Sequence, residues 1–351
     1  MTLPTGRAAM ATLIATEGSS PRAAGSRMWV DEAGRILGSV TIGGCVDARV
    51  IEASARALEE GAPALLSMAL GDEDAWAIGL TCAGTIEVLI EPVDGGAAGD
   101  PVAEALGTAR AEVEAGRPAV LVAPLSGSPR RLVVTGGGAS GTLGDATLDA
   151  VAAREASALL PAGTSGVRTI EARGETHRLY FERHAPPLTL IVFGATHVAM
   201  PLVALGRVMG LRTVVVDGRD RFATRERFPT ADALLVGMPS ELAERMPLGR
   251  GSLVVLLSHD YKYDLPVLKA VLASEAAYVG VLGSRRRGRA LLDFLGSEGV
   301  PPDQLARVRI PVGLDIGGTT PEEIALSVLA EAIAIHHGRS GGPMRDRSMP
   351  A

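Results

Sequence analysis

The 351-residue sequence has little cysteine, almost no lysine and no excess of positive charge. Its two cysteines, Cys45 and Cys82, are too few for a zinc site of their own or for a disulfide framework. Only Lys262 and Lys269 are lysines, and the formal net charge of −6 lacks the basic excess that would neutralise many phosphates. The composition therefore argues against a stapled secreted scaffold and against nucleic acid as a partner.

Long hydrophobic runs are also missing. The apolar run at 8–15 is short and leads into a turn sequence, which argues against a signal peptide. The most membrane-like stretch, 188–205, contains His197, Pro201 and a glycine where a strand would turn into a helix. We therefore expect a cytoplasmic protein with reduced thiols and no membrane partner.

The sequence does contain enough apolar residues for two cores. Hydrophobic residues make up 47% of the chain, and the mean hydropathy of +0.24 is typical of a soluble globular protein. A length of 351 residues predicts two domains. Pro186 and Pro187 mark the boundary, which gives domains at 1–185 and 186–340. The tail at 341–351, rich in Gly, Arg, Ser and Pro, is expected to be disordered.

The second domain shows the alternation of strands and helices that is typical of a parallel sheet. A helix is expected at 197–209, and the last helix has a capping box, with Thr320 as N-cap, Pro321 at the first position and Glu323 three residues after the cap. The pattern predicts an α/β, Rossmann-like, doubly wound sheet covered on both faces. Its expected strands are 188–194, 212–217, 231–237, 252–258 and 277–283.

The first domain contains a weak internal repeat, which predicts a small α/β domain. MWVDEAGRILGSV (28–40) and the helix-like 50–61 resemble RLVVTGGGASGTL (131–143) and a helix at about 145–160. Each copy ends in a strand, IEVLIEP (86–92) or RLYFER (178–183). The first copy has TIGGCVDARV where the second has GDATLD. Both copies would supply scaffold, and only the first would supply chemistry.

Two glycine-rich segments of the first copy are candidates for ligand binding. GSSPRAAGSRM offers exposed backbone N–H groups, and Arg22 or Arg27 can add a bidentate anion contact. The alternative is a hairpin loop with solvated arginines. In IGGCV, Gly43 and Gly44 precede Cys45 at the expected start of a helix, where the helix dipole favours the thiolate. The alternative for Cys45 is a buried packing cysteine.

The second cysteine lies in a similar setting. Cys82, in TCAGTIEV, stands beside a glycine at the start of an expected strand. Two cysteines in glycine-flanked turns of one domain could face one ligand.

FGATHVA opens the second domain where a dinucleotide fingerprint would lie. Gly194 fits the fingerprint, but Thr196 replaces the glycine that lets a pyrophosphate approach the backbone. His197 begins the helix and could cap it or bind an anion. Asp217 ends the second strand, where an acid would hold a ribose hydroxyl. The motif therefore predicts the fold and argues against NAD(P).

Further polar residues follow the later strands of this domain. Ser258, His259 and Asp260 are consecutive, so they do not form a catalytic triad, whose members come from different segments. Because ligands bind at the carboxyl ends of strands in open α/β sheets, we expect a ligand at this rim. We call the carboxyl-end edge of the sheet the rim. Beyond the first two strands, the residues that we expect to contact a ligand at the rim are His259, Asp260, Ser284, Arg285 and Asp315.

Taken in order, the motifs resemble the xanthine dehydrogenase accessory protein family (XdhC/CoxI). They are GSSPRAAGSRM, GSVTIGGCV, GLTCAGTIEVLIEP, GATHV, RFPTAD, SHDYKYD, YVGVLGSRR and GLDIGGTTPEEIALSVLAE, and they cover nearly the whole chain. The resemblance implies a protein that binds molybdenum cofactor, a molybdopterin, protects it while its terminal sulfur is added, and delivers it to an apo molybdenum hydroxylase. By the family pattern, Cys45 would contact the molybdenum or its sulfur, with Gly43, Gly44, Arg22 and Cys82 nearby.

The sequence departs from the family pattern at several points. It has GATH for GAGH, SHD for THD, GGTTPEE for GARTPEE, Ala83 for a second glycine and Asp47 for Glu. Of these changes, Thr196 bears most directly on a dinucleotide role.

The leading hypothesis is therefore a cofactor chaperone without catalytic residues of its own. The alternatives are an NAD(P)-dependent oxidoreductase or a nucleotide-sensing regulator on the same fold. Beside the hydroxylase client, a cysteine desulfurase and a second copy of the chain are candidate partners.

Overall fold

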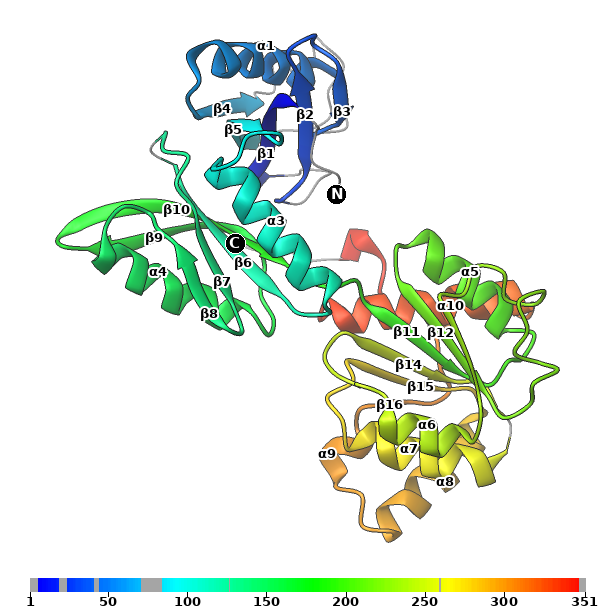
Figure 1. Cartoon of the computed structure of the whole chain (residues 1–351). Coiled ribbons are helices and arrows are strands. Elements are labelled where there is room, and N and C mark those ends of the chain that lie inside the picture. The colour runs from blue at the N-terminus through cyan, green and yellow to red at the C-terminus, as the bar shows by residue number, and fades with distance from the viewer. Residues whose placement is uncertain are drawn as a thin grey trace. The chain divides into compact units, whose positions relative to one another are not determined.

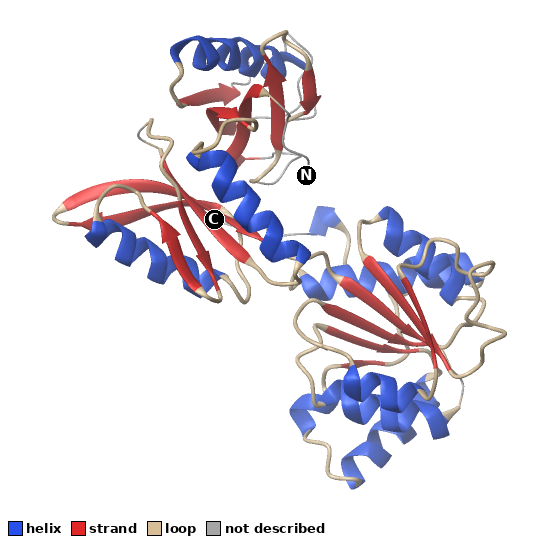
Figure 2. Ribbon diagram, in the orientation of Figure 1, coloured by secondary structure: helices blue, strands red, loops and turns tan. Residues whose placement is uncertain are grey.

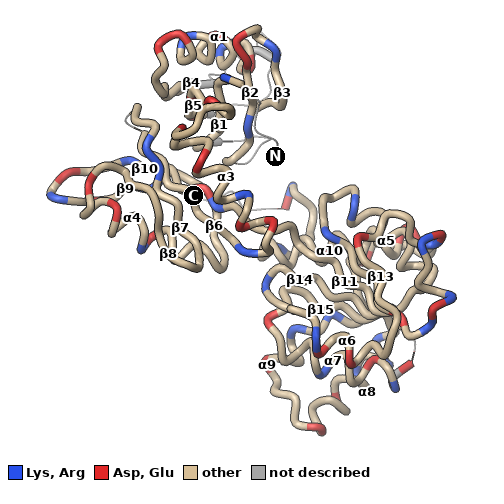
Figure 3. The backbone as a smooth tube through the Cα atoms, viewed as in Figure 1, with Lys and Arg blue, Asp and Glu red and all other residues tan. Residues whose placement is uncertain are grey.

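The computed structural model describes residues 6–18, 24–40, 44–70, 84–125, 127–258 and 260–346 (Figures 1 and 2). The chain forms two compact units, Met1–Pro186 and Pro187–Ala351. None of the helices in these ranges is both long and apolar enough to cross a membrane. Acidic and basic residues are interspersed along both units (Figure 3).

The first unit contains two antiparallel five-stranded sheets, in the orders β3-β2-β1-β5-β4 and β8-β7-β6-β10-β9. The first sheet and its helix comprise β1 (Arg7–Gly18), β2 (Arg27–Asp31), β3 (Ile36–Gly38), α1 (Gly44–Glu60), β4 (Ala64–Leu70) and β5 (Gly84–Asp94). The second comprises β6 (Ala119–Pro124), β7 (Leu132–Thr135), β8 (Gly138–Gly141), α4 (Ala146–Leu159), β9 (Gly166–Ala172) and β10 (Glu175–His184). Helix α3 (Pro101–Glu114) connects the two copies.

The identical strand orders confirm the predicted internal repeat. Gly38 and Gly141 end β3 and β8, and both have positive φ. A Cβ at Gly38 would lie 2.5 Å from the carbonyl oxygen of Arg27, and one at Gly141 would lie 2.3 Å from that of Arg131. In both copies, a side chain at this position would clash with a backbone carbonyl oxygen at the start of the neighbouring strand, so both positions require glycine.

A second pair of local contacts also repeats. Ser39 Oγ donates to an Asp47 carboxylate oxygen at 2.8 Å, and Thr142 Oγ1 donates to Asp149 at 2.7 Å. In each copy, the acid of the first helical turn thereby ties the helix to the strand before it.

Each sheet of the first unit packs against a helix on both of its faces. Helix α1 covers one face of the first sheet, and α4 covers the matching face of the second. Helix α3 packs against the other faces of both sheets through Val102, Ala105, Leu106 and Ala109 (Figure 1). The sequence favours α3 at this position because the Asp100 side chain accepts from the N–H groups of its first turn and Pro101 fits there.

The second unit is a six-stranded parallel sheet in the order β13-β12-β11-β14-β15-β16. Alternate strand residues point to opposite faces, with Val192 and Val255 in one core and Phe193 and Val254 in the other. Helices α5 and α10 cover the first core, and α6, α7 and α8 cover the second. The strands are β11 (Thr189–Phe193), β12 (Arg212–Asp217), β13 (Ala233–Val236), β14 (Ser252–Leu256), β15 (Tyr278–Val281) and β16 (Val308–Arg309). The helices are α5 (Ala199–Val208), α6 (Pro239–Arg245), α7 (Tyr261–Leu272), α8 (Arg285–Ser297), α9 (Pro302–Leu305) and α10 (Pro321–His336).

This arrangement confirms the predicted Rossmann-like sheet and all five predicted strands. The capping box of α10 is also present, because Thr320 and Glu323 each accept from the backbone of the other. Strand β16 was not predicted, because two residues carry no periodicity. The predicted disordered tail starts at 341, where the structure has a short 3₁₀ helix, η1 (Met344–Asp346), and residues 347–351 lie outside the described residues.

Candidate functional site

Helix α1 begins at the glycine-cysteine segment of the first copy. Gly44 is its first residue and Cys45 its second, so the Cys45 backbone lies at the helix N-terminus, as the sequence predicted. The side chain of Cys45 lies outside the described residues, as do Arg22, Gly43 and Cys82. The roles of these residues stay predictions.

The second copy shows what the equivalent helix start looks like without the glycines. The side chain of Asp145 caps α4 and accepts from Thr147 N and Leu148 N at 2.9 and 3.0 Å. The helix starts and the repeated aspartates align Asp145 with Gly43 and Thr147 with Cys45. The first copy thus has no carboxylate at the position that caps the helix in the second, which leaves the positive end of the α1 dipole without that anion.

Arg27, one of the two candidate anion contacts, has a protein partner instead. Its guanidinium pairs with Glu182 of β10, and the two side chains are only 7% and 11% exposed. Arg27 Nε also donates to Thr12 Oγ1 at 3.4 Å. Of the two arginines in the glycine-rich loop, Arg22 is therefore the one that stays a candidate for a ligand.

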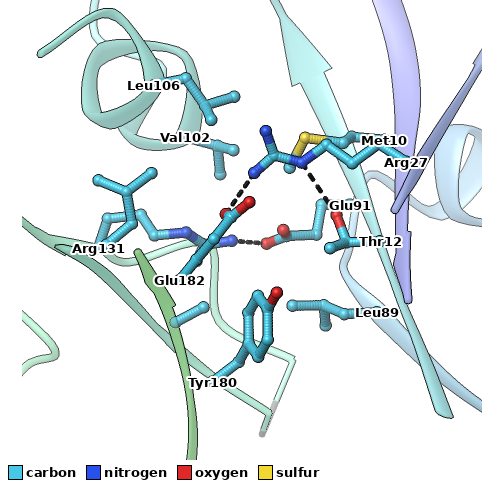
Figure 4. Close-up of a pocket in the computed structure, with 12 residues that line it drawn as sticks. Met10, Thr12, Arg27, Leu89, Glu91, Val102, Leu106, Arg131, Tyr180 and Glu182 are labelled. Carbon is cyan, nitrogen blue, oxygen red and sulfur yellow. Dashed lines mark hydrogen bonds and ion pairs between the residues drawn. The ribbon is translucent and has the colours of Figure 1, made fainter. Parts of the chain in front are cut away.

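A second buried ion pair, Arg131 with Glu91, lies beside the first (Figure 4). Burial lowers the pKa of Arg131 to about 10, so it stays protonated at neutral pH. Burial alone would raise the pKa of Glu182, but His184 and Arg27 outweigh it and hold this pKa below its usual value. The four charges surround a cavity of about 10 Å³, which has room for about one water molecule.

Sequence reasoning missed Glu91, Arg131 and Glu182. Their signal was in the repeat, since an arginine opens β2 and precedes β7, and a glutamate occupies the matching place in β5 and β10.

The fingerprint segment of the second unit follows β11. Gly194 has φ of +103°, and a Cβ there would lie 2.9 Å from Ser258 N, so only glycine lets the loops after β11 and β14 approach. The buried Thr196 hydroxyl has no hydrogen-bond partner in the part of the chain that the structure describes. His197 is exposed in the turn before α5.

Asp217 ends β12, as predicted, and is 4% exposed. Its carboxylate accepts from Ala195 N at 2.7 Å and from Arg219 N, Nε and Nη2 at 2.9 Å each. Burial alone would raise the pKa of Asp217, but the hydrogen bonds from Arg219 and Ala195 outweigh it and hold this pKa below its usual value. The acid expected to hold a ribose hydroxyl is therefore already bound by the protein.

The later rim residues also lie at the carboxyl edge, and two of them cap helices. Asp260 accepts from Lys262 N at 2.9 Å and caps α7, and Ser284 accepts from Arg287 N at 3.2 Å and caps α8. Arg285, the first residue of α8, is exposed.

Two more rim positions stay without an observed role. Asp315 is exposed in the segment before α10. His259 lies outside the described residues, between Ser258 and Asp260. The structure thus brings Asp217, Asp260, Ser284 and Arg285 to one edge of the sheet.

A pocket of about 420 Å³ opens beside the start of α5. The sequence motifs GATHV, RFPTAD and TTPEE meet there through His197, Arg227, Thr230 and Pro321. Arg227 fixes the pocket wall, because its Nη1 donates to Ala195 O at 2.9 Å and to Phe222 O at 2.8 Å. The volume of this pocket lies in the range that is typical of small-molecule binding sites.

Within the described ranges, no group of three or more His, Cys, Asp or Glu side chains is placed to hold a metal ion.

Known proteins resemble this chain over both units. A family model described as XdhC Rossmann domain matches residues 190–332, and one described as XdhC and CoxI family matches 4–69. A probable xanthine dehydrogenase subunit from Bacillus subtilis (strain 168) is 29% identical over 328 residues, which cover 93% of this chain and 92% of the relative. A molybdenum cofactor insertion chaperone, PaoD, from Escherichia coli (strain K12) is 37% identical over 82 residues, 23% of this chain and 26% of the relative.

A crystal structure of a xanthine dehydrogenase from Bacillus halodurans has the same fold, with a TM-score of 0.75. It is 28% identical, and the match covers 95% of this chain and 93% of that one. With two matching family models, a relative that matches nearly end to end and a structural neighbour of the same extent, the chain belongs to the XdhC and CoxI family.

Proposed function

We propose that this protein is an accessory protein of xanthine dehydrogenase-type hydroxylases, which binds molybdenum cofactor in its first unit and delivers it to the apo enzyme. The observation that carries the proposal is the start of α1, where Cys45 follows Gly44 at a helix N-terminus and the sequence has Gly43 at the position of the Asp145 cap. A helix N-terminus favours a thiolate and bound anions.

The chemistry of the cargo fits this segment. A molybdopterin offers a phosphate to backbone N–H groups and arginine, and its metal end can accept a thiolate ligand. In the proposed site, Gly43 and Gly44 let the cargo approach the backbone, Arg22 contacts an anionic group, and Cys45 contacts the molybdenum or its sulfur, with Cys82 nearby. Binding of this kind would shield a newly added terminal sulfur from water until transfer.

The similarity to PaoD, whose name describes a molybdenum cofactor insertion chaperone, supports a stoichiometric role rather than an enzymatic one. A hydroxylase is then the required partner. A cysteine desulfurase as sulfur donor and a homodimeric assembly are further parts of the proposal.

A second candidate function, a nucleotide-sensing regulator, is favoured by the 420 Å³ pocket that His197 lines. The rim with Gly194, Thr196, His197, Ser284 and Arg285 would then contact a phosphate. Because the Asp217 carboxylate is bound by Ala195 and Arg219, we expect NAD and NADP to bind weakly or not at all. Calorimetric titration with each nucleotide tests this, and micromolar NAD(P) affinity would refute it.

The test of the main proposal is anaerobic isolation of the protein from cells that make molybdenum cofactor. We expect a fluorescent pterin after oxidative release, molybdenum in similar amount, and activation of an apo hydroxylase by the loaded protein. Protein that carries neither pterin nor molybdenum, even after incubation with free cofactor, would refute cofactor binding.

A further inference from the structure

The two buried ion pairs of the first unit are exchanged reciprocally between the copies of the repeat. The strand registers place Met28 opposite Gly38 and Leu132 opposite Gly141, so the arginines that precede them, Arg27 and Arg131, are equivalent. Likewise, Glu91 faces Met10 in the first sheet and Glu182 faces Leu121 in the second. Each arginine pairs with the glutamate of the other copy (Figure 4).

The two equivalent arginines lie next to different segments of the chain. Arg27 ends the glycine-rich loop of the first copy, whose described end is also fixed by Gly25 N, which donates to Leu13 O at 2.8 Å. Gly25 faces the second copy as well, since a Cβ there would lie 3.7 Å from Tyr180 Oη. Arg131 occupies the same place in the copy that lacks the glycine-cysteine segment.

We propose that Glu182 of the second copy is a positioning residue for cofactor binding, because it holds Arg27 and with it the Gly25–Arg27 end of the loop that carries Arg22. The Arg131–Glu91 pair holds the second copy and has no such role. This inference rests on the proposed function.

The contacts of Arg27 allow Glu182 to set the position of the loop end at Gly25–Arg27. Its guanidinium lies between Thr12 of β1 and Glu182 of β10, strands of different copies (Figure 4). His184 Nε2 lies 3.3 Å from the same Glu182 oxygen. In a desolvated pair, loss of one partner leaves a buried charge that must reorient or take up water.

The experiment uses the equivalence of the copies as its control. Glu182→Gln and Glu91→Gln each remove one buried carboxylate next to an arginine, so their effects on folding are matched. We expect Glu182→Gln to lower the pterin content per folded protein by about tenfold, an effect on the scale of one lost charged contact. Glu91→Gln should stay within about twofold of wild type.

Hydrogen exchange of the cofactor-free proteins separates positioning from cargo binding. The Gly25 amide should exchange at least about tenfold faster in Glu182→Gln and at the wild-type rate in Glu91→Gln. If the glutamine variants fold poorly, the doubles Arg27→Met with Glu182→Met and Arg131→Met with Glu91→Met remove whole pairs and leave no charge unpaired. The same contrast is expected between them.

Equal loss of pterin in the two members of either matched set would overturn the positioning role, as would unchanged Gly25 exchange in Glu182→Gln. If the exchange contrast is present but wild-type protein retains no pterin, then the proposed function fails while the anchoring of Gly25 by Glu182 stands.

Discussion

Asp217 illustrates how a single buried carboxylate can serve the fold at the place where other proteins use it for a ligand. Four donors, Ala195 N and three nitrogens of Arg219, saturate it, so a ribose hydroxyl would have to displace a charge-assisted hydrogen bond. The interaction ties the loop after β11 to the end of β12. Its contribution to the free energy of unfolding should depend on pH.

We expect Asp217→Asn to lower the free energy of unfolding at pH 7 by about 1–3 kcal/mol, because it removes hydrogen bonds to a buried charge. The folded-state pKa of Asp217 is depressed, so its stabilisation is present above the unfolded pKa and is lost as the pH falls through the folded pKa. The gap between wild type and variant should therefore close from about pH 5 downward. Denaturant unfolding at a series of pH values measures it.

Asp260→Asn is the matched control, because asparagine keeps a capping side chain at the start of α7. It should stay within about 0.5 kcal/mol of wild type. A constant gap for Asp217→Asn across the pH range would contradict the assignment.

Cys45 is expected to act through its thiolate and to contribute little to folding. Cys45→Ser should leave the thermal transition nearly unchanged and strongly reduce the pterin and molybdenum that co-purify with the protein. Cys82→Ser should act in the same direction but less strongly. A loss of about 2–5 kcal/mol in Cys45→Ser would instead identify a packing residue.

At the scale of elements, α1 and α4 are two versions of one helix with different N-termini. Val46 and Val50 of α1 occupy the core positions of Leu148 and Ala152 in α4, so the packing faces correspond. The residue before α4, Asp145, caps that helix through its side chain, whereas the residue before α1 is Gly43, which has no side chain. An aspartate at position 43 should therefore cap α1 in the way that Asp145 caps α4.

Gly43→Asp would give α1 the cap of α4. We expect the free energy of unfolding to rise by only about a few tenths of a kcal/mol, because glycine at an N-cap is less favourable than aspartate by about that amount. Cofactor retention should fall, because the new carboxylate occupies the positive end of the helix and repels an anionic ligand. Thermal unfolding and pterin content measure the two effects.

Asp145→Gly is the reciprocal control in the second copy. It should cost a similar few tenths of a kcal/mol and leave cofactor retention unchanged. Retention that is unaffected by Gly43→Asp would argue against an anion at the start of α1.

At the scale of the whole molecule, we expect no turnover by the isolated protein. No nucleophile paired with a general base is recognisable in the sequence, and the dinucleotide fingerprint is altered at Thr196. The protein should not oxidise purines or NAD(P)H alone, and its effect should appear as activation of a hydroxylase at stoichiometric amounts. Steady NAD(P)H consumption at catalytic protein concentrations would contradict this.

The sequence predicted the fold of the second unit well, because buried parallel strands are continuous apolar runs and α10 has a strong start signal in Thr320 and Glu323. It also predicted the repeat and the helix that starts at Gly44. It could not resolve the choice between Arg22 and Arg27, because the partner of Arg27 is 155 residues away. Nor could it show that Asp217 is saturated, since three of its four donors come from Arg219, a residue with other plausible roles.

The reciprocal ion pairs of the first unit have one more consequence. Contacts in which residue i of one body meets residue j of the other, and j meets i, are the signature of a twofold axis between identical protomers. Glu87 and Arg178, which occupy equivalent positions, also meet, at 2.7 Å, as residues on such an axis would. The first unit is thus arranged as a homodimer whose halves are joined in one chain by α3. Fusion frees such a dimer from the rule that both halves must change together, so one half can carry glycine and cysteine at the start of its helix while its twin keeps an aspartate cap.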